Sequence, residues 1–355
     1  MAPVSRLFPA EERDKLPVSV ITGFLGSGKT TLLNRLLRDE AMAGSAVIIN
    51  EFGEVPLDGA LIGAKAGEVV TLANGCLCCV VGDDFEAAMG NLYRSAGGVG
   101  GEDIRRILIE TSGLADPAPI IGTLLNSPMM STWTALDSVI TTVDAVHALT
   151  QLREHPEAAT QIAFADRLVV TKADMVPPEA LAEVRREIER QNQHGRMIIA
   201  SEGEVSPSQL FGVQSKDGKA NAEHLAEVMQ RIGAHGHDHS VHGADHHHTP
   251  DVEAFAIVAR KPLDWSRFNR WLRGVRLAHA DDLLRMKGIL DLAGEDKPVA
   301  VHAVRHVFHP PSALESWSGT DRASRLVFIV RGGRLRKFIE QSFAADVVNH
   351  KETAS

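Results

Sequence analysis

A glycine-rich segment near the start of the chain constrains the fold more than any other feature of the sequence. Gly23-Phe24-Leu25-Gly26-Ser27-Gly28-Lys29-Thr30 follows a short β-branched run and opens a helical one. A glycine, four residues and then Gly-Lys-Thr between a strand and a helix is typical of a loop that cradles phosphates. Backbone N–H groups turn inward there, and the helix N-terminus favours negative charge. The segment predicts nucleotide binding on an α/β fold.

The phosphate loop supplies most of the predicted nucleotide contacts. We expect Lys29 to reach the β- and γ-phosphates as a catalytic residue, and Thr30 to ligate Mg²⁺. A second motif, Ile107-Leu108-Ile109-Glu110-Thr111-Ser112-Gly113, ends a strand with a carboxylate and then a glycine. Glu110 is predicted to hold Mg²⁺ through water or to orient the attacking water, and the Gly113 amide to contact the γ-phosphate. The predicted nucleotide contacts are Gly23, Gly26, Ser27, Gly28, Lys29, Thr30, Thr31, Gly113, Lys172 and Asp174.

A third motif, Thr171-Lys172-Ala173-Asp174, predicts which base is bound. A carboxylate at Asp174 can accept hydrogen bonds from guanine N1–H and N2–H₂, whereas adenine presents an acceptor at N1. The stem of Lys172 can lie along the base. GTPases with this motif usually have asparagine where Thr171 stands, and a hydroxyl cannot reproduce the two-sided amide contact. We therefore expect GTP over ATP, with the preference softened at Thr171.

The three cysteines of the chain fall within four residues, Cys76, Cys78 and Cys79. Such a cluster is too local to join distant elements by disulfides, and thiolates select zinc and other soft ions over magnesium or calcium. A tetrahedral site needs a fourth ligand, and Glu51 is a candidate because it follows the next strand after the phosphate-loop helix. We predict a metal site that binds zinc, with cobalt as the alternative. Structural zinc and a redox cluster are the competing interpretations.

A histidine-rich tract at residues 235–248 offers auxiliary metal ligands on a polar segment that cannot bury much apolar surface. Histidine occupies seven of its fourteen positions. Imidazoles on such a segment can capture zinc, cobalt or nickel weakly, and a solvated linker is the plainer interpretation. The histidines are His235, His237, His239, His242, His246, His247 and His248.

Short apolar runs that alternate with helical patterns up to residue 212 predict a largely parallel sheet covered on both faces. We expect an α/β P-loop NTPase domain at residues 1–212, a flexible His-rich linker at 213–250, and a small α+β C-terminal domain at 251–355. In the last of these, residues 299–308 are predicted to form one strand with His302 and His306 on a common face.

The composition of the chain argues against nucleic acid and membranes as partners. The net charge of −9 argues against a broad nucleic-acid-binding surface, and no apolar run approaches the roughly 20 residues of a membrane span. Residues 1–15 contain three acidic residues and no apolar run, which argues against a signal peptide. We expect a cytoplasmic protein whose thiols stay reduced.

Together these residues resemble the CobW-type family of P-loop GTPases, which are metallochaperones and metal-insertion factors. The resemblance covers nearly the whole chain. It rests on GFLGSGKTTLLN, NEFGEVPLD, GCLCC, ETSGLADP, VDA and TKAD, and then on PLDW, LLRMKG, HAVRHVFHP and RLVFI, which look like the family's C-terminal domain. It implies that Cys76, Cys78 and Cys79 bind the cargo metal, and that residues 51–80 rearrange with the nucleotide state.

The implied mechanism is a GTP-driven switch that binds zinc tightly with GTP and Mg²⁺ and delivers it to a client metalloprotein after hydrolysis. Nucleotide-dependent self-association is compatible with it. Two other classes stay open: a histidine-rich metal buffer or sensor with incidental GTPase activity, and a P-loop kinase or transferase with structural zinc. Removing residues 235–248 separates the first from a chaperone, because a buffer would lose most of its bound metal.

Overall fold

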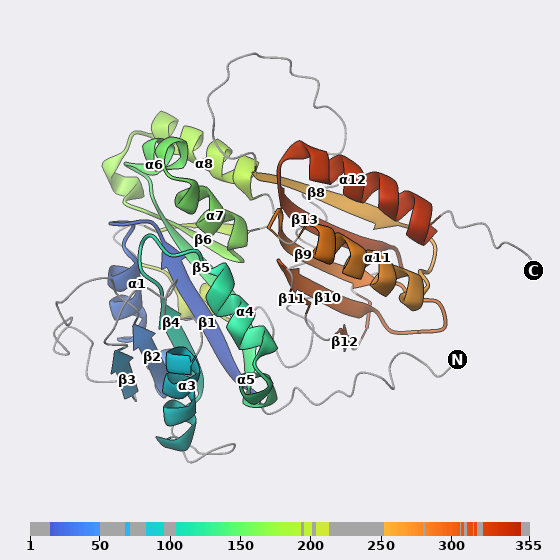
Figure 1. The fold of residues 1–355 in the computed structure, drawn as a ribbon. Helices are drawn as coiled ribbons and strands as arrows, with labels where there is room; N and C mark the ends of the chain where they lie inside the picture. Colours follow the sequence, from blue (N-terminus) through green and yellow to red (C-terminus); the bar gives the residue numbers. More distant parts are fainter. Residues whose placement is uncertain are drawn as a thin grey trace, which may run out of the picture. The chain divides into compact units, whose positions relative to one another are not determined.

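A computed structural model describes residues 15–49, 68–71, 83–95, 104–192, 195–200, 204–212, 252–279, 281–305, 307–308, 311–314, 316–317 and 322–348. The chain divides into two compact units. The described part of the first unit lies between residues 15 and 212, apart from residues 190–192, which are grouped with the second unit. The rest of the described part of the second unit begins at residue 252. Figure 1 shows a sheet with helices packed on it in each unit.

The first unit is built on a parallel sheet of seven strands in the order β3-β2-β4-β1-β5-β6-β7. β-Branched and other apolar residues dominate these strands, as expected where both faces of a parallel sheet are buried. The strands are β1 (Leu16–Gly23), β2 (Ser45–Ile49), β3 (Glu68–Thr71), β4 (Arg106–Glu110), β5 (Thr134–Asp144), β6 (Arg167–Thr171) and β7 (Arg196–Ile199).

Helices connect these strands and lie on both faces of the sheet (Figure 1). They are α1 (Lys29–Leu36), α3 (Asp83–Ser95), α4 (Ala118–Asn126), α5 (Pro128–Trp133), α6 (Ala148–Glu154), α7 (Pro156–Phe164), α8 (Pro178–Gln191) and α9 (Pro207–Leu210), with 3₁₀ turns η3 (Glu40–Met42) and η4 (Ala173–Met175). On one face, α1 packs with Ile21, Val47 and Leu108. On the other, α6, α7 and α8 pack with Leu168 and Val170. The alternation of side chains along β6 separates the two cores, since Val169 belongs to the first.

The strand register brings distant residues to one edge of the sheet. Ile21 pairs with Glu110, Gly23 with Thr142, and Asp144 with Thr171. Because all of these strands are parallel, their carboxyl ends meet at the same edge, which is where ligands bind on such sheets.

The second unit is an antiparallel sheet in the order β11-β10-β9-β13-β8, with β12 paired to β10. Its strands are β8 (Val252–Ala259), β9 (Leu283–Leu290), β10 (Val299–Val304), β11 (Val307–Phe308), β12 (Ser312–Ala313) and β13 (Ser324–Arg331). Helices α11 (Trp265–Ala278) and α12 (Gly333–Phe343) share one core with Phe255 and Phe328, and the π-helical turn η5 (Ala344–Val348) follows α12. Trp271 joins the two helices by donating from Nε1 to Ser342 Oγ at 2.9 Å.

The prediction of a single strand over residues 299–308 is wrong. Strand β10 ends at Val304, Arg305 takes a left-handed φ of 50°, and β11 returns antiparallel along β10, pairing Ala303 with Phe308. A positive φ at a non-glycine residue is uncommon, so this reversal had no glycine or asparagine to signal it. The expected common face of His302 and His306 rested on an unbroken strand, and His306 lies outside the described residues.

The predicted fold class is confirmed, with a parallel α/β sheet first and a smaller α+β unit second. Among the described residues, no helix has the length and apolar character needed to cross a membrane. The predicted linker at residues 213–250 lies outside the described residues, and the boundaries at 212 and 250 stay predictions.

Candidate nucleotide site

The phosphate loop joins β1 to α1 at the carboxyl edge of the sheet. Gly26 and Gly28 have φ values of 70° and 92°, a region that glycine enters without the steric cost paid by other residues. Lys29 is buried, and its Nζ donates to the carbonyl oxygens of Gly23 at 2.9 Å and Phe24 at 3.2 Å. The loop is therefore curled around its own lysine, with the ammonium group held at its centre.

Thr30 and Glu110 meet at this edge from different elements. Thr30 lies in the first turn of α1 and donates from Oγ1 to Glu110 Oε1 at 2.6 Å. Glu110 is the last residue of β4 and is only 5% exposed. The two side chains offer oxygen atoms alone, which is the ligand type that Mg²⁺ prefers. The structure thus brings together two residues that the sequence places eighty positions apart.

The segment after Glu110 lies directly against the phosphate loop. A Cβ atom placed on Gly113 would lie 2.8 Å from the backbone nitrogen of Leu25 and 2.9 Å from its Cα. Contacts this close with backbone atoms exclude any side chain at position 113. The residues that follow form a turn, with the Ala115 N–H donating to the Ser112 carbonyl at 3.2 Å. Glycine at this position lets the two loops touch.

The predicted base loop is also tied to the phosphate loop. Thr171 Oγ1 donates to the carbonyl oxygen of Ser27 at 2.8 Å, and Lys172 Nζ donates to that of Gly26 at 3.0 Å. Lys172 has a left-handed φ of 55° and precedes the turn η4, on which Asp174 is exposed. The hydroxyl of Thr171 is thus used to hold the phosphate loop.

Asp144 also lies at this edge, and the sequence pointed to it only as part of the VDA motif, without a predicted role. It ends β5 with its side chain buried, and its Oδ2 accepts from Lys172 Nζ at 2.7 Å and contacts His147 Nδ1 at 2.9 Å. Burial by itself would raise the pKa of this carboxyl group, but the hydrogen bonds from Lys172, His147 and the Val146 backbone outweigh it and lower the pKa. Asp144 therefore stays ionised and orients Lys172. A carboxylate at the end of a buried strand was the available signal.

The remaining predicted residues divide by location. Ser27 is buried, and its Oγ lies 2.7 Å from Thr142 Oγ1 at the end of β5. Thr31 is exposed on α1, next to Thr30. The predicted metal ligands, namely Glu51, Cys76, Cys78, Cys79 and the histidines of residues 235–248, lie outside the described residues. The structure thus places the predicted phosphate and base residues along one sheet edge.

Two family models match the chain in tandem. Residues 17–199 match the model described as CobW/HypB/UreG, nucleotide-binding domain, and residues 252–345 match the cobalamin synthesis protein CobW C-terminal domain. The first match ends with β7 and the second begins with β8.

Individual relatives agree with these models. The zinc chaperone YjiA of Escherichia coli is 33% identical over 314 residues, covering 88% of this chain and 93% of its own. The zinc chaperone CobW of a Sinorhizobium species is 31% identical over 344 residues, covering 89% of this chain and 92% of its own. The crystal structure of zinc-bound YjiA GTPase superposes with a TM-score of 0.65 at 27% identity, covering 92% of this chain and 98% of that one. The chain belongs to the CobW/HypB/UreG family, with a CobW-type C-terminal domain.

Proposed function

We propose that this protein is a GTP-hydrolysing metallochaperone. It binds zinc at a site formed by Cys76, Cys78, Cys79 and Glu51, holds the metal tightly in the GTP state, and delivers it to a client protein after hydrolysis. Cobalt is the second candidate for the cargo metal.

The observation that carries this proposal is the register of three neighbouring strands. Ile49 at the end of β2 pairs with both Glu110 at the end of β4 and Thr71 at the end of β3. Glu51 follows Ile49 by two residues, and Cys76 follows Thr71 by five. At about 3.5 Å per residue, the chain keeps Cys76 within roughly 17 Å of the end of β3. The segment with Glu51 therefore begins on the strand next to Glu110, and the segment with the cysteines begins one strand further along the same edge.

The chemistry on the nucleotide side is GTP hydrolysis. The held position of Lys29 suits contacts to the β- and γ-phosphates, and the oxygen pair of Thr30 and Glu110 suits Mg²⁺. When bound, Mg²⁺ supplies positive charge that offsets the charge developing on the phosphate oxygens. The contact of Glu110 with Thr30 supports a metal-holding role for Glu110 over orientation of the attacking water. Asp174 selects guanine.

The relatives support both halves of the function. YjiA and CobW are named zinc chaperones, and a protein of Schizosaccharomyces pombe, 31% identical over 226 residues, is named zinc-regulated GTPase metalloprotein activator 1. Thiolate ligands agree with zinc as the cargo. We assign recognition of the client metalloprotein to the C-terminal unit and place the protein in the cytoplasm, where thiols stay reduced.

The proposed coupling is a two-state switch. The γ-phosphate contacts only one of two states of the nucleotide site, so GTP favours that state and GDP does not. If this state also orders the metal segments, GTP and zinc raise each other's affinity by the same factor. Loss of the γ-phosphate then weakens the metal site and permits transfer.

Competition titrations with zinc and cobalt test the proposal. Affinities are measured in Mg²⁺ with GDP, with a non-hydrolysable GTP analogue and without nucleotide, for the natural chain and for Cys78→Ser. We expect zinc binding to be much tighter with the analogue than with GDP, and this difference to disappear in Cys78→Ser. Equal zinc affinity in all three nucleotide conditions would show that the metal site and the nucleotide site are not coupled, and the metallochaperone proposal would fail.

A further inference from the structure

A glutamine lies fully buried in helix α7. Gln161 is 0% exposed, as is the phenylalanine at the end of the same helix, and every residue from 158 to 164 is buried. A buried primary amide is costly unless its polar atoms are hydrogen-bonded, by roughly 1–3 kcal/mol judged from mutational data. The neighbouring residues of the helix are mostly alanine or large apolar residues and cannot hydrogen-bond the amide through their side chains. The amide therefore needs hydrogen-bond partners elsewhere to offset the cost of its burial.

The partner is the loop that follows Glu110. The side-chain nitrogen of Gln161 donates to the carbonyl oxygen of Gly113 at 3.1 Å and to that of Ala115 at 3.0 Å. Both hydrogens of the amide are thus directed to the same three-residue stretch. Between the two bonded carbonyls stands Leu114, whose side chain is 52% exposed. The loop has its apolar residue in solvent and is attached to the helix layer through Gln161.

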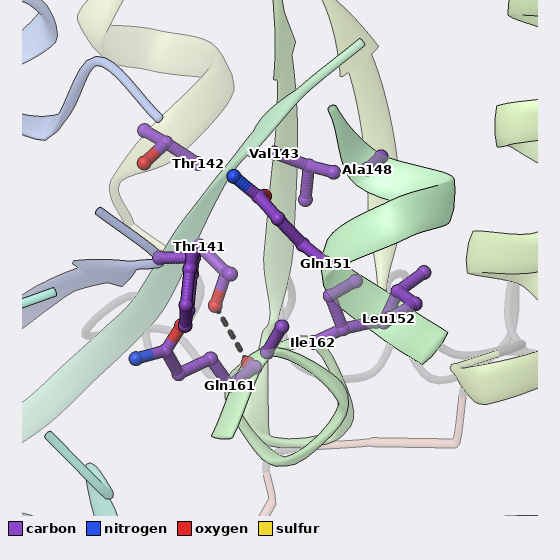
Figure 2. A pocket seen from close by; sticks show the side chains of 10 residues that line it. Thr141, Thr142, Val143, Ala148, Gln151, Leu152, Gln161 and Ile162 are labelled. Carbon is purple, nitrogen blue, oxygen red and sulfur yellow. Dashed lines mark hydrogen bonds between the residues drawn. The ribbon is translucent and has the colours of Figure 1, made fainter. Parts of the chain in front are cut away.

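Helix α7 is itself fixed to the strand beside the phosphate loop. Thr141 Oγ1 in β5 donates to the backbone carbonyl of Gln161 at 2.8 Å, as drawn in Figure 2. The next residue of β5, Thr142, contacts Ser27 of the phosphate loop. Gln161 therefore belongs to a continuous set of contacts from the phosphate loop, through β5 and α7, to the loop that carries Gly113.

We infer that Gln161 is a positioning residue for GTP hydrolysis. By holding the carbonyls on either side of Leu114, it fixes residues 113–115 against the phosphate loop before nucleotide binds. The Gly113 amide then needs no reorganisation when the γ-phosphate is transferred. Gln161 acts through this loop and touches no phosphate. The inference rests on the GTP hydrolysis of the proposed function and not on metal delivery.

Steady-state GTP hydrolysis by Gln161→Met tests this role. Methionine keeps the length and burial of glutamine and removes both donors. Since a displacement of about 1 Å at a reacting group can lower a rate about a hundredfold, we expect kcat to fall by roughly ten- to a hundredfold. The affinity for GDP should stay unchanged, because GDP has no γ-phosphate to contact Gly113 and because Lys29, Lys172 and Asp174 are not altered.

Two control variants separate positioning from loss of packing. Gln151 of α6 lines the same small cavity as Gln161, and in Figure 2 the two amides point in different directions. Gln151→Met makes the same chemical change beside the loop anchor and should keep kcat. Thr141→Val removes the hydrogen bond between β5 and α7 but leaves the two hydrogen bonds from Gln161 to the loop. It should therefore lower the melting temperature and have only a small effect on kcat.

The outcomes are distinct. An unchanged kcat in a folded Gln161→Met variant, or an equal fall in Gln151→Met, overturns the inference. If Gln161→Met does not fold, hydrogen exchange on the natural chain decides: the Ala115 amide should open with the same free energy as the amides of α7, and independent, easier opening overturns the inference. If the natural chain hydrolyses no GTP, the proposed function is wrong. This result is obtained with the natural chain alone, so it is distinct from a failure of the inference about Gln161.

Discussion

At the scale of single residues, the hydroxyl of Thr171 gives the first position of the Thr171–Asp174 motif a contact within the protein. Its Oγ1 lies 2.8 Å from the Ser27 carbonyl and 3.3 Å from the Val143 carbonyl, so its donor is used within the protein. Under the proposed function, contacts with the base are then left to Asp174 and the stem of Lys172. The proposed function thus assigns the positioning of the phosphate loop to Thr171 and the selection of the base to Asp174.

We predict that Thr171→Val weakens GDP and ADP binding by the same factor. Valine keeps the shape of threonine and removes the hydrogen bond to Ser27, whose net value is about 0.5–1.5 kcal/mol. Asp174→Ala should instead weaken GDP and leave ADP unchanged, because only guanine offers donors to that carboxylate. Equilibrium titration of both nucleotides against both variants measures this. A loss confined to GDP in Thr171→Val would place Thr171 in base recognition.

Residue-level patterns in the sequence were enough to single out the glycine-rich loop, Glu110 and residues 171–174, which the structure places at one sheet edge, because glycines, lysines and carboxylates at strand ends are chemically distinctive. Gln161 carried no such mark. Its role depends on a helix and a loop that are separated by 46 residues or more and meet only in the folded chain. A single glutamine in an alanine-rich segment is indistinguishable from a surface residue in the sequence alone.

At the scale of elements, the strands of the parallel sheet were predictable and the helices α6 and α7 were not. The strands are short runs of Val, Ile and Leu next to glycine or an acidic residue. Helix α7 is buried from Ala158 to Phe164, so it has no polar face and therefore no 3.6-residue alternation of apolar and polar side chains. Such a helix forms because of its tertiary packing, and its sequence pattern does not predict it.

The second sheet contains a position where the closeness of two strands can be tested. Gly288 of β9 pairs with Leu326 of β13, and a Cβ atom there would lie 2.7 Å from the carbonyl oxygen of Arg325. We predict that Gly288→Ala destabilises the C-terminal unit by about 1–3 kcal/mol, since the strands must separate to admit the methyl group. Urea unfolding followed by tryptophan fluorescence reports mainly on this unit, because Trp265, Trp271 and Trp317 lie in it and only Trp133 lies in the first.

The matched control is Gly274 in α11, where an added Cβ would meet nothing within 4 Å. Gly274→Ala should be stabilising by about 0.5–1 kcal/mol, because alanine loses less backbone entropy in a helix than glycine does. Equal effects of the two substitutions would contradict the close strand contact at Gly288.

At the scale of the whole molecule, the two groups of proposed metal ligands occupy different parts of the sequence: Glu51 and the cysteines lie between the phosphate loop and Glu110, and the histidine tract lies far from both. The described nucleotide residues lie in the first unit, and the histidine tract lies in sequence between the described parts of the two units. A metallochaperone and a histidine-rich buffer therefore differ in which part holds the metal.

We predict that deleting residues 235–248 lowers the number of zinc ions bound weakly but leaves one tight site that depends on GTP. Imidazoles on a polar segment bind metal independently of nucleotide, whereas the thiolate site is coupled to it. Zinc titration of the deletion variant with GDP and with the GTP analogue checks this. Loss of most bound zinc together with the nucleotide effect would favour the buffer.

The bonds from Thr171 and Lys172 to the carbonyls of Ser27 and Gly26 make the base loop and the phosphate loop one mechanical unit. A nucleotide whose base fits poorly must displace Lys172, and the same displacement pulls on the backbone that surrounds the triphosphate. Such a nucleotide is penalised twice, once in how tightly it is held and again in how quickly it is cleaved. Under the proposed function, selection of guanine would in this way act on the turnover step as well as on binding.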